Sequence, residues 1–108
     1  MIDSGSIKLL MNWDIKPGRD EEFFGFMIRE WVPGVTKLGL QPTGSWLTIY
    51  SHHESDNPQI MTEGITDDLL SMREILNSGE WKALHEQLLQ YVTNYRQKVV
   101  RTTGGFQI

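Results

Sequence analysis

The sequence predicts an α+β fold in which strands and helices follow one another in the order β-α-β-β-α-β. Segments whose side chains alternate between apolar and polar, as in strands, occur near both ends and in the middle of the chain. Between them, apolar residues recur with the spacing of amphipathic helices. The length of 108 residues leaves room for one ordinary core, so we expect residues 1–108 to form one domain with loose ends at 1–5 and 102–108.

The first strand is predicted over residues 6–15, where the side chains alternate with a period of two. Its more apolar side should face the helices, and its other side carries Asn12 and Asp14 but also the apolar Leu10. Pro17 and Gly18 end the strand.

The first helix is predicted from the acidic residues 20–22, which suit the positive end of a helix dipole, to Gly39, which suits a helix end. Pro33 lies inside this segment and lacks a backbone donor, so we expect a kink or a break there. Phe26 falls on the face of the helix opposite Trp31, so it is expected to be exposed. The residues expected on the buried stripe are Phe24, Met27, Ile28, Trp31, Val35 and Leu38.

The middle of the chain predicts a hairpin. Residues 42–51 and 59–66 have the composition and alternation of strands, and a polar turn joins them. His52 and His53 lie in or beside that turn, where neighbouring side chains point to opposite sides of a continuing strand, so they are not expected to share a metal ion.

The last part of the chain predicts a broken helix and a strand. Asp67 and Asp68 open the helix, and Ser78 can cap a second helical piece over residues 80–93. Val99 and Val100 supply the β-branched residues of a final strand over 95–101.

This order of elements predicts a four-stranded antiparallel sheet with the helices on one face, which is the ferredoxin-like arrangement. The second face of the sheet is partly apolar, because Leu10 and residues of the hairpin fall on it. Such a face favours a cover, and we expect the sheet of a second copy to provide it.

Composition excludes several classes of function. The net charge of −4, with scattered basic residues, argues against a nucleic-acid partner. Since the chain has no cysteine, a disulfide framework, a Cys-bearing metal centre and thiol chemistry are excluded. The N-terminus lacks the features of a signal peptide and no apolar run approaches the length of a membrane span, so a cytoplasmic protein without a membrane partner is expected.

Two segments resemble a known superfamily. Residues 15–23 read Ile-Lys-Pro-Gly-Arg-Asp-Glu-Glu-Phe, and residues 78–84 read Ser-Gly-Glu-Trp-Lys-Ala-Leu before the final strand. They resemble the dimeric α+β barrel superfamily, in particular its antibiotic-biosynthesis-monooxygenase and NIPSNAP-like branches. The resemblance implies a homodimer whose two sheets form a barrel, and a pocket between sheet and helices. Members include cofactor-free monooxygenases, haem-degrading enzymes, lactone isomerases and many proteins of unknown activity.

His85 is the first candidate for chemistry. At helical spacing it falls on the same side as Trp81, Leu84 and Leu88, which should face the sheet. Its usual pKa makes it a natural proton carrier in a small pocket. The alternative is a core histidine bonded to a backbone carbonyl or a strand side chain.

Asn12 and Tyr50 are the other candidate catalytic residues, because either could hold an oxygen on which charge develops. For Asn12 the alternative is a polar group at the dimer interface. The resemblance to haem-degrading members, which use an Asn, a Trp and a His, is not carried over, since the Trp81–His85 spacing does not match their pattern. No cofactor and no metal site are expected.

The tryptophans predict an aromatic wall. Flat rings suit a flat apolar ligand, although ordinary core packing uses the same residues. The candidate ligand-binding residues are Trp13, Trp31, Trp46 and Trp81.

Two functions stay open at this point, and the residues do not decide whether the chain is an enzyme. The first is a homodimeric barrel protein that binds a small apolar or aromatic molecule between sheet and helices, with cofactor-independent monooxygenation or isomerisation as its chemistry. The second is a non-catalytic dimerisation or binding module whose core is filled by side chains.

Overall fold

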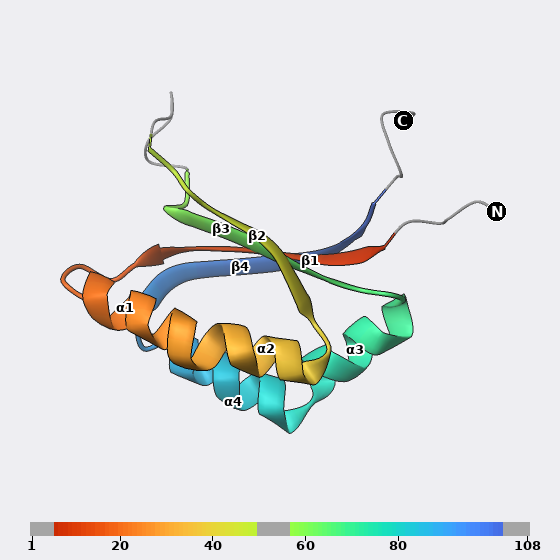
Figure 1. Cartoon of the computed structure of the whole chain (residues 1–108). Helices are drawn as coiled ribbons and strands as arrows, with labels where there is room; N and C mark the ends of the chain where they lie inside the picture. The colour runs from red at the N-terminus through yellow and green to blue at the C-terminus, as the bar shows by residue number, and fades with distance from the viewer. Residues whose placement is uncertain (1–5, 50–56, 103–108) are drawn as a thin grey trace.

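Four strands form one antiparallel sheet in the order β2-β3-β1-β4, and all helices lie against one of its faces (Figure 1). The computed structural model describes residues 6–49 and 57–102. The predicted α+β, ferredoxin-like order of elements is confirmed. The elements are β1 (Ile7–Ile15), α1 (Asp20–Phe26), η1 (Met27–Trp31), α2 (Val32–Leu38), β2 (Gln41–Leu47), β3 (Ile60–Thr66), α3 (Leu69–Asn77), α4 (Gly79–Leu88) and β4 (Val92–Arg101).

The central strand β1 carries the core of the sheet. It pairs with β3 on one side and with β4 on the other. Its side chains alternate between buried and partly exposed, as its sequence predicts. Trp13 and Leu9 are fully buried beneath the helices, so the apolar side of β1 faces them and the side of Asn12 faces away.

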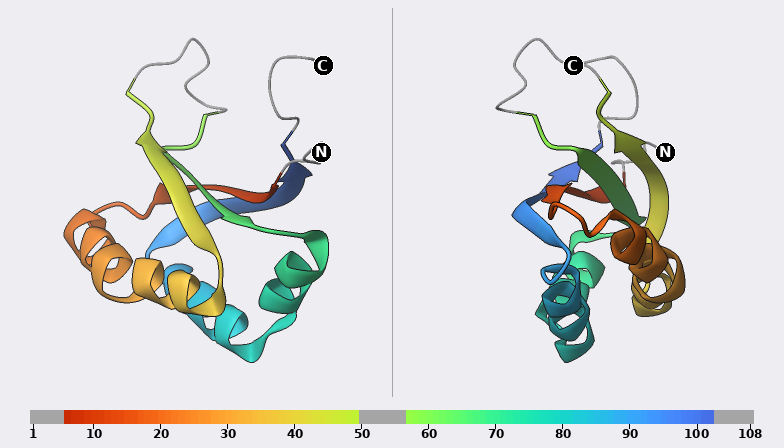
Figure 2. Two further views of the ribbon diagram at one scale, coloured as in Figure 1. Left: turned by 45° about the vertical axis from the view of Figure 1, so that its right-hand side comes forward. Right: turned by 90° about the vertical axis from the view of Figure 1, so that its left-hand side faces the viewer.

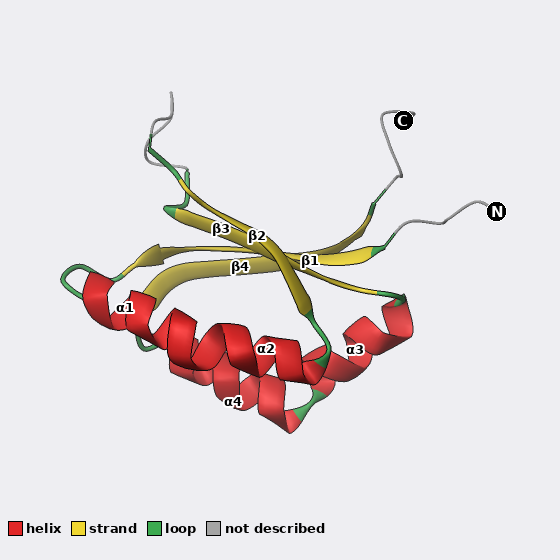
Figure 3. Ribbon diagram, viewed as in Figure 1, coloured by secondary structure: helices red, strands yellow, loops and turns green. Residues whose placement is uncertain are grey.

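The views in Figures 2 and 3 show that the sheet has one covered and one open face. The helical segments α1, η1 and α2 run along one half of the covered face, and α3 with α4 runs along the other. No helix of the described residues crosses to the open face. The position of any side chain on the sheet therefore decides whether it meets the helices.

The first helix differs from the prediction in which side chains it buries. Phe23 and Phe26 are buried, whereas Phe24 is 47% exposed and Ile28 is 74% exposed. The expected stripe was wrong over this part because η1 is a turn of π-helix, which contains one residue more than an α-helical turn. The extra residue shifts the buried face of the helix before η1 by one position, so Phe23 is buried in place of Phe24.

The π turn also bears on how the helix accommodates Pro33. A kink or a break was predicted at Pro33; the chain stays helical from Asp20 to Leu38, so there is no break. Pro33 lies in the first turn of α2, directly after the π turn, where a missing backbone donor is tolerated. The helix ends at Gly39, whose φ of 104° is in the left-handed region that glycine adopts without strain.

The second helical segment follows its predicted caps. The Asp68 side chain accepts a hydrogen bond from the backbone N–H of Ser71, and the Ser78 hydroxyl accepts one from that of Trp81. Helix α4 ends at Leu88, earlier than predicted, and β4 begins at Val92. Asn94, with a φ of 56°, lies at the irregular pairing of β4 with β1, within a strand that begins earlier than predicted.

Candidate functional site

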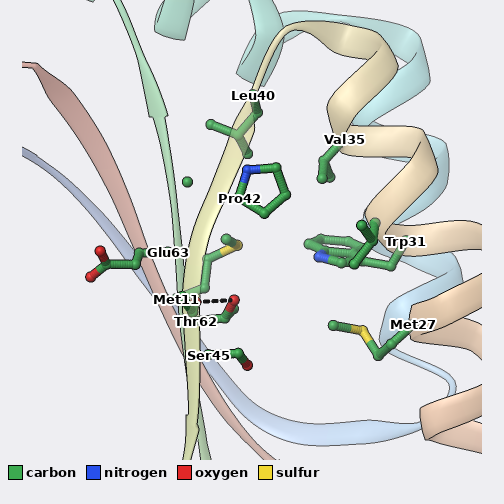
Figure 4. A pocket seen from close by; sticks show the side chains of 12 residues that line it. Met11, Met27, Trp31, Val35, Leu40, Pro42, Ser45, Thr62 and Glu63 are labelled. Atoms are coloured by element: carbon green, nitrogen blue, oxygen red, sulfur yellow. Dashed lines mark hydrogen bonds between the residues drawn. The ribbon is translucent and has the colours of Figure 1, made fainter.

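A cavity of about 250 Å³ lies between the covered face of the sheet and the first helix, beneath the edge strand β2. Figure 4 shows the Trp31 ring opposite Pro42 and Thr62, with Met27 and Val35 beside it. The residues that line the cavity are Met11, Met27, Trp31, Val32, Val35, Leu40, Pro42, Gly44, Ser45, Thr62, Glu63 and Gly64.

The elements around the cavity explain why space is left there. On the covered face of β3, the small residues Thr62 and Gly64 stand where larger side chains would reach the helix. A Cβ atom at Gly64 would lie 2.7 Å from the Leu40 side chain, so this glycine permits Leu40 to pack against the strand. The π turn places Met27 and Trp31 on the opposite wall.

Two hydroxyl groups give this apolar cavity a polar patch. Ser45 and Thr62 are register partners on β2 and β3, and Figure 4 shows both oxygens on the cavity side of the strands. Thr62 is 9% exposed, and its Oγ1 donates a hydrogen bond to the Gly44 carbonyl at 3.1 Å.

Glu63 reaches the cavity with its backbone and turns its side chain to the open face of the sheet (Figure 4). Its carboxylate accepts hydrogen bonds from Lys8 and Thr43, each at 2.9 Å. Burial raises the pKa of Glu63, but the hydrogen bonds from Lys8 and Thr43 and the Lys8 charge together hold that pKa below its usual value. The carboxylate is thus paired with groups outside the cavity.

Of the four tryptophans predicted to form a ligand site, only Trp31 lines this cavity. Trp13 and Trp81 are buried with it in an aromatic cluster, in which the ring centroids of Trp31 lie 6.2 Å from Trp13 and 5.5 Å from Trp81. Trp46 is 54% exposed and pairs with Met61 on the open face. The predicted wall is therefore divided between two faces of the sheet.

His85 lies on the side of α4 that faces the sheet, as predicted. Its ring stacks on Trp81 and meets the edge of the Tyr95 ring from β4. Its Nε2 atom is buried and has no hydrogen-bond partner among the described residues. Burial lowers the pKa of His85, and the nearby Glu86 charge opposes this only in part, so the neutral imidazole is favoured. Burial also raises the pKa of Tyr95.

The predicted catalytic residues are not brought together. Asn12 points to the open face, where a second hollow of about 420 Å³ is bordered by Trp46, Met61, Arg96 and other residues of the strands. His85 lies on the covered face. Tyr50, and likewise His52 and His53, fall outside the described residues.

Sequence reasoning missed most of the cavity wall. Met27 was predicted on the buried stripe, but Val32, Pro42, Ser45 and Thr62 were not singled out. One available signal was the pair of small residues Thr62 and Gly64 on the covered face of a strand, because small side chains opposite a helix leave space. Among residues 6–49 and 57–102, no cluster of His, Asp or Glu side chains has the arrangement needed to hold a metal ion.

Comparison with families and curated sequences gives no match: no family model matches the chain, and no curated protein matches it. Within the described segments, none of the helices is long and apolar enough to cross a membrane.

Solved structures give clear matches. An ethyl tert-butyl ether degradation (EthD) family protein from Bacillus halodurans aligns with a TM-score of 0.71 and 17% identity, over 90% of this chain and 98% of its own. An uncharacterised NIPSNAP domain protein from Burkholderia xenovorans aligns with a TM-score of 0.63 and 13% identity, over 89% and 93%. A dimeric protein of unknown function with a ferredoxin-like fold, from Bacteroides fragilis, aligns with a TM-score of 0.62 and 10% identity, over 94% and 100%. At these identities the likeness concerns the fold, and the chain has the ferredoxin-like fold of these proteins.

Proposed function

We propose that this protein binds a small, largely apolar molecule in the cavity between the first helix and strands β2 and β3. The observation that carries the proposal is the cavity itself, about 250 Å³ in volume and walled mainly by Met, Val, Leu, Pro and Trp side chains. For comparison, an apolar cavity of roughly 150 Å³ in another protein admits benzene. A ring with one or two small substituents would therefore fit.

Binding is better supported than catalysis. The Glu63 carboxylate points away from the cavity, and neither His85 nor Asn12 lines it. Cofactor-independent monooxygenation or isomerisation needs a group that takes a proton from the ligand. The described walls of this cavity direct no ionisable side chain at its contents, so a binding protein is the function that we propose.

A homodimer is part of the same proposal, with the open faces of two sheets packed together. Trp46 and Met61 lie side by side in neighbouring strands and are 54% and 45% exposed. The partly buried Leu10 borders the same hollow. A second copy would remove this apolar surface from water, which is the usual reason for a patch of this kind. The Bacteroides fragilis protein of the same fold is itself described as dimeric.

The binding proposal is tested by titrating the isotope-labelled protein with p-xylene and following backbone amide signals by NMR. We expect saturable shifts in residues around the cavity. Val32, 42% exposed, lies in the cavity wall at the start of α2, so Val32→Trp should block entry and abolish the shifts. Ile28→Trp is the matched control, since Ile28 lies one turn earlier, is 74% exposed and does not line the cavity.

The proposal fails if p-xylene produces no saturable shifts in a parent protein that remains folded. It also fails if Val32→Trp and Ile28→Trp bind p-xylene as well as the parent does.

A further inference from the structure

We infer that the cavity selects a ligand that carries a neutral hydroxyl group on an otherwise apolar body, held between the oxygen of Thr62 and the indole N–H of Trp31. This inference rests on the proposed binding function and specifies the chemistry of its ligand. It follows from the hydrogen-bonding capacity that each of the two side chains has left.

Thr62 offers an acceptor and no donor. A threonine hydroxyl has one proton and two lone pairs. The proton of Thr62 is directed to the Gly44 carbonyl at 3.1 Å, so only lone pairs remain for a ligand. Because this oxygen lies on the cavity side of β3, a ligand group that donates a hydrogen bond would satisfy it (Figure 4).

Trp31 offers a donor and no acceptor. Its ring lines the cavity across from Thr62, and the residue as a whole is only 2% exposed. The indole nitrogen forms no hydrogen bond with any part of the chain that the structure describes. The Trp13 nitrogen is also unpaired, but it is fully buried and Trp13 does not line the cavity. An indole nitrogen can only donate, so it requires an accepting atom.

A hydroxyl group meets both requirements with a single oxygen. It donates its proton to Thr62 Oγ1 and accepts from the Trp31 N–H. An ether, by contrast, only accepts, and a protonated amine only donates. A carboxylate cannot donate, and the described residues of the wall include no cationic side chain to balance its charge. Ser45, which can donate or accept, stands next to Thr62 and does not alter this choice.

The test compares three ligands of similar shape by NMR titration: p-cresol, 4-methylanisole and p-xylene. Each ligand is compared with itself across protein variants, because p-cresol loses more hydration on binding than p-xylene. Thr62→Val keeps the shape of the side chain and removes its oxygen. We expect this variant to weaken p-cresol binding roughly threefold to tenfold, the range of one hydrogen bond, and to leave p-xylene and 4-methylanisole within about twofold.

Trp31→Phe removes the N–H donor together with some volume. The volume change should affect all three ligands, and p-xylene measures it. Beyond that shared change, p-cresol and 4-methylanisole should each lose roughly a further threefold or more, because both accept a hydrogen bond through oxygen.

Thr48→Val is the matched control. Thr48 also donates its hydroxyl proton to a backbone carbonyl, that of Pro58 at 2.7 Å, but it does not line the cavity. It should leave the binding of all three ligands unchanged. Thermal unfolding of each variant verifies that it is folded at the temperature of the titration.

The hydroxyl inference is overturned if Thr62→Val leaves p-cresol binding unchanged, or weakens p-xylene as much as p-cresol. If p-xylene binds the parent in such a case, the proposed function stands without the hydroxyl inference. If none of the three ligands binds the folded parent, the proposed function and this inference fall together.

Discussion

The rings of His85 and Tyr95 meet edge to face, with centroids 4.5 Å apart and planes inclined by 73°. The His85 ring also stacks on Trp81, and its Nε2 atom is buried without a partner among the described residues. A proton on Nε2 would place a charge among aromatic surfaces, where no other described residue accepts a hydrogen bond from it. The ring is therefore more easily protonated in the unfolded chain than in the folded one.

This relationship predicts how stability depends on pH. Burial lowers the pKa of His85 in the folded protein below its usual 6.5. The unfolded state consequently binds more protons once the pH falls below about 6.5. The contribution of His85 to stability is full above that pH and is lost as the pH falls through the folded-state pKa. Urea unfolding between pH 7.5 and pH 5 should show this decrease.

His85→Phe isolates the effect from the other two histidines, because it retains an aromatic ring that cannot titrate. The free energy of unfolding of this variant should change less between pH 7.5 and pH 5 than that of the parent. Equal pH dependence in the two proteins would show that His85 does not prefer its neutral form on folding.

The displacement caused by the π turn predicts an inverted pattern of stability. Phe26 is 4% exposed and stacks on Tyr91, so Phe26→Ala should destabilise the fold by about 3–5 kcal/mol. Phe24 is 47% exposed, so Phe24→Ala should cost about 1 kcal/mol or less. Chemical denaturation measures both, and a larger loss at Phe24 would mean that the helix is α-helical throughout.

The cap of α4 predicts a smaller effect. The Ser78 hydroxyl accepts a hydrogen bond from the Trp81 backbone at 3.1 Å, so Ser78→Ala should destabilise the protein by about 1 kcal/mol. Asn77→Ala, at the exposed position before it, should change stability by about 0.5 kcal/mol or less. Thermal or urea unfolding measures both losses. Equal losses of stability in the two variants would contradict the assignment of Ser78 as the cap of α4.

The proposed dimer predicts a change in mass. Light scattering after size-exclusion chromatography should give the parent about twice the chain mass of 12.5 kDa. Met61→Lys places a charge on the open face and should convert the protein to a folded monomer. Leu70→Lys, at a position of α3 that is 66% exposed, should leave the dimer intact. A monomeric parent, or a monomer produced only by Leu70→Lys, would contradict the proposed interface.

The fold could be predicted from the sequence because its signals are local. The alternation along residues 7–15 correctly predicted the buried side of β1, and Ser78 correctly predicted the start of α4 as its cap. What could not be predicted was the π turn, since a constant 100° per residue assumes regular helix on both sides of Trp31. For this reason alone, Phe24 was predicted to be buried and Phe26 to be exposed, which is the reverse of what the structure shows.

The site was less predictable, because it depends on which elements meet across the sheet. From residue type alone, Trp13, Trp31, Trp46 and Trp81 were predicted to form one wall. In β2, however, side chains alternate between the two faces of the sheet, and Trp46 lies on the open face as the register partner of Met61. The cavity arises from small residues such as Thr62 and Gly64 opposite the first helix. These small residues leave a cavity only when β1, β2 and β3 pair in the observed register, and that register cannot be predicted from the sequence of any one strand.

The most direct test of the binding site uses the methionine methyl groups as reporters of where a ligand lies. Met11 and Met27 line the cavity, whereas Met61 is on the open face and Met72 is buried away from both hollows. With methyl-labelled methionine, bound p-xylene should give intermolecular nuclear Overhauser effects to Met11 and Met27 and none to Met72. Contacts to Met61 without contacts to Met11 or Met27 would place the ligand on the open face and contradict the account.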